Sequence, residues 1–275
     1  MTTVRAASAA LAEESERRHP EEPFPQYRLR SWEAAFPGVI CGVTEAREDA
    51  DFGASGNSAW TFLQRVEGLS SQLGFPAAAW ARQVHGVEVR RADDVAEGFM
   101  SPGEADGLLA CRVGALLIVT VADCVPVFIL DPKRSAMALL HAGWRGASAG
   151  ILRRGVEALG TEYGCRPQDL HVHLGPAICG RCYEVGREVL ASFGDATGEA
   201  GRLDLRDELL DQALALDVPG GQMSRSTWCT SCDRDRFHSH RGSQGAAGRM
   251  AAFLGWRDPV DGSPGGPAGG QIRLP

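Results

Sequence analysis

The sequence predicts one mixed α/β (α+β) domain, in which strands and helices follow one another without a fixed rhythm. Short runs rich in Val, Ile and Leu are typical of buried strands, and other segments carry apolar residues at helical spacing. The order of these segments lacks the regular alternation of a doubly wound parallel sheet, and no internal repeat is visible. The chain has 275 residues, of which 44% are hydrophobic, so it can bury a sizeable core.

The first half of the chain is expected to consist mainly of strands. The expected elements are a strand at 38–46, a helix at 57–75, two short strands at 77–95 around a turn at His85-Gly86, and several strands at 104–143. Glycines and an Asp-Pro pair divide the last of these segments, and such residues favour turns. These breaks are Gly107, Gly114, Asp131-Pro132 and Gly143.

The second half is expected to carry most of the helices. Ile151, Leu152, Val156 and Leu159 lie on or near one face of a helix at 147–164. The other expected elements are a strand at 169–178, helices at 184–194 and 203–218, a strand or loop at 222–229 and a short element at 248–256. Residues 26–257 form the expected single domain, between a disordered N-terminal arm at 1–25 and a disordered, Pro/Gly-rich tail at 258–275.

Composition and charge exclude several functional classes. The formal net charge of −7 leaves no general basic field for nucleic acid. The longest apolar run, at 115–121, is far shorter than the roughly 20 residues of a membrane-spanning helix. The N-terminal residues lack the apolar segment of a secretion signal, so we expect a cytoplasmic protein whose eight cysteines are thiols rather than disulfides.

Cys124 and His141 stand at the two ends of a predicted hairpin. A symmetric turn at positions 131–134 would place them directly opposite each other, with Cβ atoms about 4.5–5.5 Å apart on one face of the sheet. Pro132 cannot adopt the positive φ of a two-residue type I′ turn, so a four-residue loop is expected. A shift of the pairing by one residue would turn the two side chains to opposite faces.

His85, at the predicted turn before Gly86, is the best candidate for a third ligand on the same ion. Two histidines and one cysteine hold zinc tetrahedrally and leave one position open, as in catalytic rather than structural zinc sites. Zinc at such a site lowers the pKa of a bound water towards about 7. The sequence therefore predicts His85, Cys124 and His141 as metal ligands and as the catalytic centre.

Seven motifs of the chain resemble those of the YfiH-type laccase-domain family, also called polyphenol oxidase or multicopper laccase-like. In chain order they are RQVHG, EADGLLA, VADCVPV, LLHAGWRG, HLGPAICGRCYEVG, CTSCDRDRFHSHRG and AGRMAAF. The resemblance covers about residues 39–256, and the ADCVPV and HAGWRG motifs together are specific to the family.

The resemblance implies a single domain with the YfiH/CNF-like layered sandwich of mixed β-sheets flanked by helices. It also implies zinc bound by His85, Cys124 and His141, and a purine nucleoside phosphorylase with adenosine deaminase activity. The implied substrates are phosphate and adenosine, inosine, guanosine or S-methyl-5′-thioadenosine. The expected assembly is a monomer or a small homo-oligomer, with no nucleic acid or membrane partner.

Five residues near the expected zinc site are candidates for binding substrate. Arg145 follows His141 closely and suits phosphate or ribose, while Gln83 and Asp123 flank the expected ligands His85 and Cys124. Arg241 is a further candidate from the CTSCDRDRFHSHRG motif. Arg47 is the nearest counterpart of an arginine in the family's N-terminal TTR motif, in a loop at 47–58 that departs from the family pattern.

Other chemistries remain as alternatives. A multicopper oxidase needs about ten histidines for its copper centres, and the chain has 7, although one copper ion could occupy the His/Cys/His site. The common zinc deaminase motif is absent, because Glu88 has the wrong spacing from His85 and Pro176 is separated from Cys179. A cysteine hydrolase with Cys124 as nucleophile and His141 as base would use the same pair. The divergent loop also leaves open a metal-binding protein without turnover.

Two CxxC pairs and two His-x-His pairs are interpreted as structural. The long separation between Cys179-x-x-Cys182 and Cys229-x-x-Cys232 favours core or pocket-wall thiols over a second, four-thiolate zinc site. His171 and His173, like His238 and His240, are alternate residues that share one face of a strand, an arrangement that arises without a metal.

Overall fold

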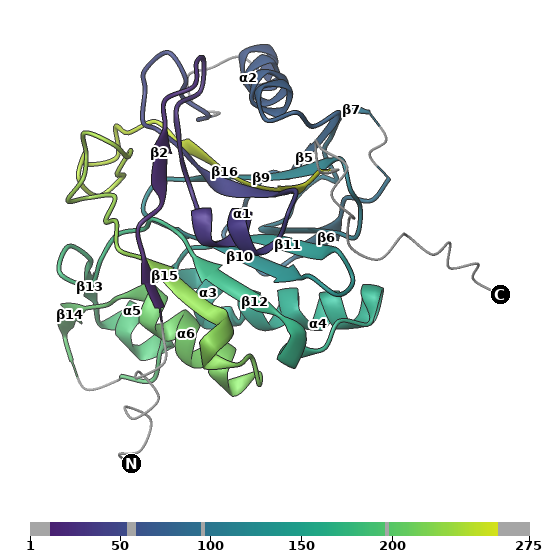
Figure 1. Ribbon diagram of the computed structural model, residues 1–275. Coiled ribbons are helices and arrows are strands. Elements are labelled where there is room, and N and C mark those ends of the chain that lie inside the picture. Colours follow the sequence, from purple (N-terminus) through teal and green to yellow (C-terminus); the bar gives the residue numbers. More distant parts are fainter. Residues whose placement is uncertain (1–11, 54–58, 95–96, 196–197, 258–275) are drawn as a thin grey trace.

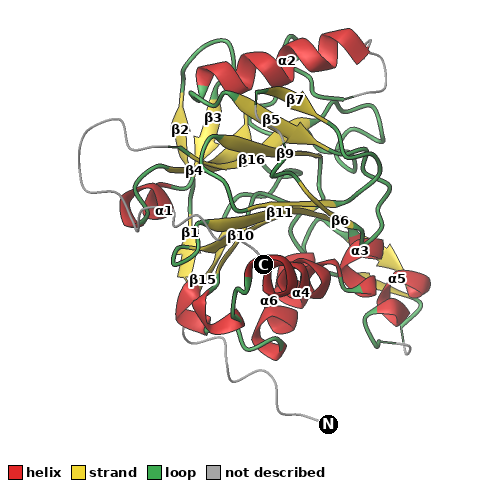
Figure 2. Ribbon diagram, turned by 90° about the vertical axis from the view of Figure 1, so that its right-hand side faces the viewer, coloured by secondary structure: helices red, strands yellow, loops and turns green. Residues whose placement is uncertain are grey.

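Two large sheets packed face to face form the centre of the molecule, and helices cover both outer faces (Figures 1 and 2). The computed structural model describes residues 12–53, 59–94, 97–195 and 198–257. The four layers confirm the expected mixed α/β sandwich. Within these residues, no helix combines the length and the apolar character that crossing a membrane requires.

The first sheet has seven strands in the spatial order β1-β15-β12-β10-β11-β8-β6. Their bounds are β1 (Ala12–Glu14), β15 (Met223–Ser226), β12 (His171–Leu174), β10 (Val125–Asp131), β11 (Ala136–Ala142), β8 (Gly107–Ala110) and β6 (Val89–Arg91). The pairs around β10 and β11 are antiparallel, whereas β12 and β15 run parallel. A mixed sheet results.

The second sheet also has seven strands, in the order β2-β3-β4-β16-β9-β5-β7. Their bounds are β2 (Arg17–His19), β3 (Gln26–Arg28), β4 (Val39–Thr44), β16 (Met250–Trp256), β9 (Ala115–Val121), β5 (Ala77–Trp80) and β7 (Gly98–Met100). A separate two-stranded sheet pairs β13 (Glu184–Gly186) with β14 (Ala200–Arg202).

The helices lie on opposite sides of the paired sheets. On the outer face of the first sheet lie α3 (Trp144–Ala149), α4 (Ile151–Tyr163) and α6 (Leu205–Ala215), with α5 (Arg187–Ser192) beside them. On the outer face of the second sheet lies α2 (Ala59–Gln72), and the short α1 (Arg30–Ala35) lies at the side. Two 3-10 turns occupy Pro167–Asp169 and Gly220–Gln222.

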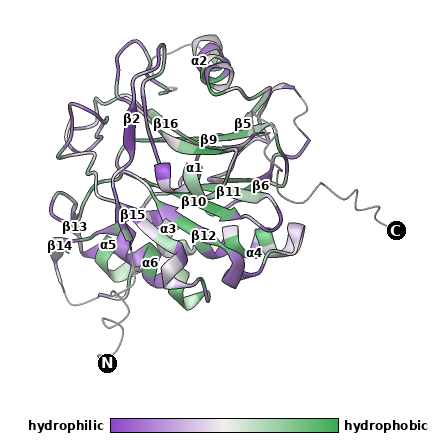
Figure 3. Cartoon of the chain, viewed as in Figure 1, coloured by the Kyte–Doolittle hydropathy of each residue, from purple (hydrophilic) through white to green (hydrophobic). Residues whose placement is uncertain are grey.

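Three apolar clusters fill the spaces between the layers. One lies between the first sheet and α4 and α6, and includes Ile129 and Leu209. Another lies between the two sheets and includes Phe128 and Leu117, and the third lies beneath α2. Hydrophobic residues accordingly concentrate on the central strands, whereas β2 is hydrophilic (Figure 3). Strands buried on both faces explain why these segments are almost continuously apolar in the sequence.

The expected helix at 147–164 is divided into α3 and α4. Gly150 adopts φ of 89°, a left-handed conformation that ends the first helix and precedes the second. The expected helix at 184–194 begins later than predicted. Residues 184–186 form the strand β13, and α5 begins at Arg187. The expected strand at 38–46 and the last element at 248–256 correspond to β4 and β16.

Residues 12–19 form two short strands of the large sheets, within the segment at 1–25 that the sequence analysis expected to be a disordered arm. Strand β1 pairs with β15 of the first sheet, and β2 pairs with β3 of the second. Between them, Glu16 is only 3% exposed and its carboxylate accepts hydrogen bonds from His173 at 2.9 Å and Ser226 at 2.6 Å. Backbone pairing and this buried network hold a segment whose charged composition suggested solvent exposure. Residues 1–11 and the expected tail at 258–275 lie outside the described residues.

Candidate active site and metal centre

His85, Cys124 and His141 come together at one end of the paired sheets. His85 lies in the connection from β5 to β6 and Cys124 in the connection from β9 to β10, and both connections pass from the second sheet to the first. His141 lies on β11 of the first sheet. Their ligand atoms lie within 4.8 Å of one another, so the three side chains can contact a single ion.

The hairpin of β10 and β11 brings Cys124 and His141 together with a register that differs from the expected one. His141 pairs with Pro126 and not with Cys124, so directly opposite placement was wrong. The loop is the expected four-residue one, at 132–135, and its last residue Ser135 adopts φ of 54°. The pairing is therefore displaced by two residues. Because side chains alternate with a period of two, this displacement keeps both residues on the same face.

Asp106 fixes two of the three candidate ligands. Its buried carboxylate accepts backbone N–H bonds from Val84, His85 and Gly86 at 3.1, 2.9 and 2.7 Å. These bonds hold His85, which has a left-handed φ of 59°, a conformation that costs about 1–3 kcal/mol in a residue other than glycine. Asp106 also lies 2.9 Å from Nδ1 of His141. An ionised carboxylate only accepts, so His141 Nδ1 carries the proton and Nε2 is left to bind a metal.

The site favours the protonation states of an ion pair when no metal is bound. Burial alone would raise the pKa of Cys124, but the charge of His141 and hydrogen bonds from both histidines lower it to about 6. Burial opposes the positive charge of His141, yet the Cys124 thiolate and Asp106 raise its pKa to about 9. The thiol is therefore predisposed to ionise, which suits either a metal ligand or a nucleophile.

Gly143 provides the space between His85 and Cys124. A Cβ atom at this position would lie 3.0 Å from His85 Cδ2 and 3.1 Å from the Cys124 sulfur. Its φ of −77° and ψ of 169° are open to any residue, so the requirement is for space and not for backbone conformation.

The three candidate ligands line a cavity of about 620 Å³, the size of a small-molecule site. Aromatic and aliphatic side chains from several elements form part of its wall: Trp80, Trp144, Ile178, Tyr183 and Leu205. Four arginines also line it: Arg82, Arg145, Arg241 and Arg249. The cavity thus combines apolar surface with positive charge next to the three candidate ligands.

The structure places Gln83 and Asp123 at the cavity, but their polar atoms hold the protein together. The Gln83 side chain donates to Thr120 O at 2.8 Å and accepts from Thr120 N at 2.7 Å, so it fastens the His85 loop to β9. The Asp123 carboxylate accepts from the Thr230 hydroxyl and from the Arg241 backbone N–H, both at 2.6 Å. Both side chains therefore position neighbouring segments.

Arg145 and Arg241 present cationic groups at the cavity. The Arg145 guanidinium lies 4.3 Å from the centre of the Trp144 ring, and that of Arg241 lies 5.2 Å from the centre of the Tyr183 ring. Arg241 also donates to the backbone oxygen of Glu184 at 2.6 Å. Within the described residues neither guanidinium group pairs with a carboxylate, so both are available for an anion.

Arg47 is not among the residues that line the cavity. Its guanidinium forms ion pairs with Glu22 at 2.9 Å and Asp49 at 2.8 Å, and these side chains take up its donors. Arg249 lines the cavity, and among the described residues its guanidinium bonds to the backbone oxygens of Ala247 and Gly248 and to no carboxylate. The sequence analysis did not single out Arg249, although it lies in the AGRMAAF motif.

Asp106 and Tyr183 are further residues that sequence reasoning missed. Asp106 lies in the EADGLLA motif and directly precedes Gly107, the first residue of a buried strand. An aspartate next to a buried strand could have indicated a functional or supporting carboxylate. Burial first, and then the charge of Cys124, raise the pKa of Tyr183, whereas Arg241 and Arg145 lower it. Tyr183 therefore lies close to the candidate ligand Cys124 and to the cationic side chains of Arg241 and Arg145.

The two His-x-His pairs have separate environments. His173 is buried and bonds to Glu16 and to Ser224 at 2.8 Å, and His171 packs edge-on against Phe36. His240 lines the cavity, whereas Nε2 of His238 is buried without a hydrogen-bond partner in the described part of the chain. None of the four belongs to a group of metal-binding side chains among the described residues.

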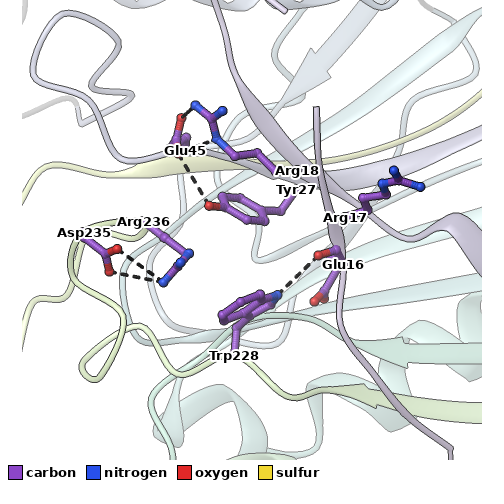
Figure 4. Close-up of a pocket in the computed structure, with 8 residues that line it drawn as sticks. All are labelled: Glu16, Arg17, Arg18, Tyr27, Glu45, Trp228, Asp235 and Arg236. Atoms are coloured by element: carbon purple, nitrogen blue, oxygen red, sulfur yellow. Dashed lines mark hydrogen bonds and ion pairs between the residues drawn. The ribbon is translucent and has the colours of Figure 1, made fainter. Parts of the chain in front are cut away.

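A second hollow of about 440 Å³ lies between Tyr27 and Trp228 (Figure 4). Its polar groups are paired with one another: Arg18 with Glu45 at 2.7 Å, Arg236 with Asp235 at 3.3 Å, and Trp228 Nε1 with Glu16 O at 3.4 Å. Because most of its charged side chains already have partners, Arg17 excepted, and no group of metal-binding side chains among the described residues lies there, the cavity at Cys124 is the candidate active site.

The chain belongs to the family described as multi-copper polyphenol oxidoreductase laccase, whose model matches residues 53–257. It is 32% identical over 260 residues to a purine nucleoside phosphorylase YlmD from Geobacillus stearothermophilus, an alignment that covers 84% of this chain and 94% of the relative. It is 39% identical over 195 residues to a purine nucleoside phosphorylase from Deinococcus radiodurans, covering 68% of this chain and 74% of that one.

Solved structures show the same fold. The crystal structure of the hypothetical protein YfiH from Bacillus licheniformis matches with a TM-score of 0.77 and 25% identity, covering 87% of this chain and 99% of that one. The crystal structure of YlmD from Geobacillus stearothermophilus matches with a TM-score of 0.76 and 29% identity, covering 88% of this chain and all of that one (100%).

Proposed function

We propose that the protein is a zinc-dependent purine nucleoside phosphorylase that also deaminates adenosine. The observation that carries this proposal is the grouping of His85, Cys124 and His141 in a cavity that also holds arginines without carboxylate partners. A metal-binding set and an anion-binding set in one pocket suit a reaction between a neutral nucleoside and phosphate. The names of the relatives from Geobacillus and Deinococcus support the same activity.

The three candidate ligands fit zinc. Two imidazoles and one thiolate are ligands that zinc accepts, and three protein ligands leave a fourth position open for substrate or water. When bound there, zinc would supply a Lewis acid that polarises an oxygen of the reactants. Copper binds such donors more tightly, but a multicopper centre needs more histidines than the 7 in this chain.

The arginines are assigned to phosphate and the apolar wall to the nucleoside. Phosphate is recognised well by planar guanidinium groups, which can donate two parallel hydrogen bonds. Arg145, Arg241 and Arg249 supply such groups, and Trp80 and Tyr183 supply aromatic faces for a purine. In phosphorolysis, a phosphate oxygen bonds to C1′ of the ribose while the C1′–N9 bond breaks. The base leaves with the bonding electron pair and takes up a proton.

Deamination of adenosine would use the same cavity but a different nucleophile. Water would add to C6 of the purine and ammonia would leave, giving inosine with the glycosidic bond intact. This reaction consumes no phosphate. The two activities can therefore be separated by their products and by their dependence on phosphate.

The test is an assay of zinc-loaded protein on adenosine, in which adenine, ribose 1-phosphate and inosine are measured separately. We expect adenine and ribose 1-phosphate only when phosphate is present, and inosine with or without it. An absence of product in both channels from protein with metal bound would instead leave a metal-binding protein without turnover.

A cysteine hydrolase is the second candidate, because the pKa of Cys124 lies at about 6 beside the cationic His141. Such an enzyme would act without metal. Activity that disappears on chelation and returns with zinc supports the phosphorylase, whereas activity that rises when the metal is removed supports the hydrolase.

A further inference from the structure

Four cysteines form a second compact group of thiols behind the wall of the cavity. Cys179 and Cys182 follow β12, and Cys229 and Cys232 follow β15. Their four sulfur atoms lie within 4.8 Å of one another, and those of Cys182 and Cys232 are 3.4 Å apart. A zinc ion with four thiolates at about 2.3 Å places the sulfurs roughly 3.8 Å apart, so the group already has nearly that size.

The parallel pairing of β12 and β15 explains how the two CxxC pairs meet. The two CxxC pairs are 50 residues apart in the sequence. The strands that precede them, β12 and β15, are nevertheless direct neighbours in the first sheet. The pairing extends beyond the strands as a parallel bridge between Ala177 and Cys229. The long separation between the pairs led the sequence analysis to favour core or pocket-wall thiols, but the length of chain between two segments says nothing about their adjacency in a sheet.

Both CxxC segments fold into the same tight turn. The backbone N–H of Cys182 donates to Cys179 O at 2.9 Å, and that of Cys232 donates to Cys229 O at 3.2 Å. One backbone N–H group also points at sulfur: that of Cys179 donates to the Cys229 sulfur at 3.2 Å. Such an N–H group stabilises anionic sulfur and orients it, as the outer partners of metal ligands do.

The first turn of α6 holds the two turns in place. Asp204 accepts a hydrogen bond from the Gly180 N–H at 3.1 Å, and its carboxylate pairs with Arg206. Arg206 in turn donates to the backbone oxygens of Ser226 and Trp228 at 2.9 and 3.0 Å. The Asp204–Arg206 ion pair therefore connects the turn at 179–182 to the segment that precedes Cys229. These hydrogen bonds hold the four thiols together in addition to the contacts between the sulfur atoms.

We propose that Cys179, Cys182, Cys229 and Cys232 bind a second, structural zinc ion. Four thiolates complete a tetrahedral shell with no open position, which is the arrangement of structural zinc. Multi-iron clusters place metal and sulfide between their cysteines and need wider spacing. Cys229 is buried and Cys232 is exposed, so the ion can enter from the side of Cys232.

The second zinc would stabilise the wall of the active-site cavity. Ile178 and Tyr183, on either side of the first turn, line the cavity. Thr230, in the second turn, donates to Asp123, which precedes the candidate ligand Cys124. The inference does not depend on the proposed reaction, since a structural metal would be required by any chemistry at this cavity.

The first experiment counts zinc in protein purified under reducing conditions, by elemental analysis and native mass spectrometry. We expect two zinc ions per wild-type chain and one per chain in Cys232→Ser. Cys111→Ser removes an exposed thiol outside the group and should retain two. A metal content that is the same in Cys232→Ser as in the wild type, iron in place of the second zinc, or a Cys182–Cys232 disulfide in the reduced preparation would overturn the proposal.

A spectroscopic experiment covers the case in which Cys232→Ser fails to fold. His85→Ala removes a ligand of the other site only, so its remaining ion reports on the thiol group. With cobalt in place of zinc, its thiolate-to-metal absorption should be about four times that of one cobalt bound through Cys124 alone, because four thiolates contribute rather than one. An absorption that corresponds to a single thiolate, or no bound cobalt, would overturn the proposal.

Discussion

Asp106 organises the candidate active site without belonging to the group of candidate metal ligands. Its carboxylate holds three successive backbone N–H groups around His85 and the Nδ1 of His141. Burial favours the neutral acid, but the hydrogen bond from His141 and the N–H groups of Gly86 and Val84 lower the pKa of Asp106 below its usual value. It therefore stays ionised and orients both histidines.

We predict that Asp106→Asn weakens zinc binding at the His85 site by roughly 10- to 100-fold. The amide has only one acceptor oxygen, and its NH₂ group faces backbone N–H groups that need an acceptor. A zinc titration against a competing chelator measures the effect. Asp211→Asn, on the exposed side of α6, is the matched control and should bind zinc as the wild type does.

The space at Gly143 gives a second prediction at the scale of one residue. Gly143→Ala should weaken zinc binding by roughly ten-fold or more, because overpacking of this kind costs about 1–3 kcal/mol and falls directly on two ligands. Gly221→Ala, where an added Cβ meets nothing within 4 Å, is the control. Unchanged zinc affinity in Gly143→Ala would show that the ligands do not need this space.

The candidate ligands could be found from the sequence, but the residues that support them could not. Cys124 and His141 stand out because few other reactive side chains lie in their apolar segments. Asp106 resembles any aspartate before a glycine until the fold brings the 84–86 loop and β11 to its carboxylate. Arg47 and Arg249 could not be distinguished, because the choice depends on which loop reaches the cavity.

At the scale of elements, the register of β10 and β11 shows which property of a hairpin the sequence defines. The alternation of side chains determines which face Cys124 and His141 share. They remain on the same face although the pairing of the strands is displaced by two residues from the expected register. The exact pairing depended on Ser135, whose positive φ the sequence did not signal. The two CxxC pairs lie close together because β12 and β15 are adjacent strands. This adjacency follows from the order of strands in the sheet and cannot be inferred from the spacing of the cysteines in the sequence.

The ordered N-terminal strands allow a prediction about stability. Glu16→Ala should lower the free energy of unfolding by about 1–3 kcal/mol, because it leaves the buried His173 and Ser226 without their hydrogen-bond acceptor. Urea unfolding followed by tryptophan fluorescence measures this change. Glu13→Ala removes an exposed partner of Arg225 and should change stability by less than about 1 kcal/mol. If Glu16→Ala changed the free energy of unfolding as little as Glu13→Ala does, the buried contacts of the segment at 12–19 would contribute little to stability.

At the scale of the whole molecule, the site exists because two sheets are stacked and the chain crosses between them. Two crossings deliver His85 and Cys124, and the end of β11 delivers His141. The sequence predicted the layers through the family resemblance and the apolar strands. It did not predict the parallel pair β12 and β15, which connects the cavity wall to the four-cysteine group.

In the proposed function, His85, Cys124 and His141 hold the metal on which phosphate-dependent cleavage of purine nucleosides depends. The most direct test compares ribose 1-phosphate formation from adenosine and phosphate by zinc-loaded wild type, by Cys124→Ala and by Cys111→Ser. We predict product from the wild type and from Cys111→Ser, and a loss of at least about 100-fold in Cys124→Ala, as expected when a catalytic metal is lost. Full activity in Cys124→Ala, or none in the zinc-loaded wild type, would contradict the account.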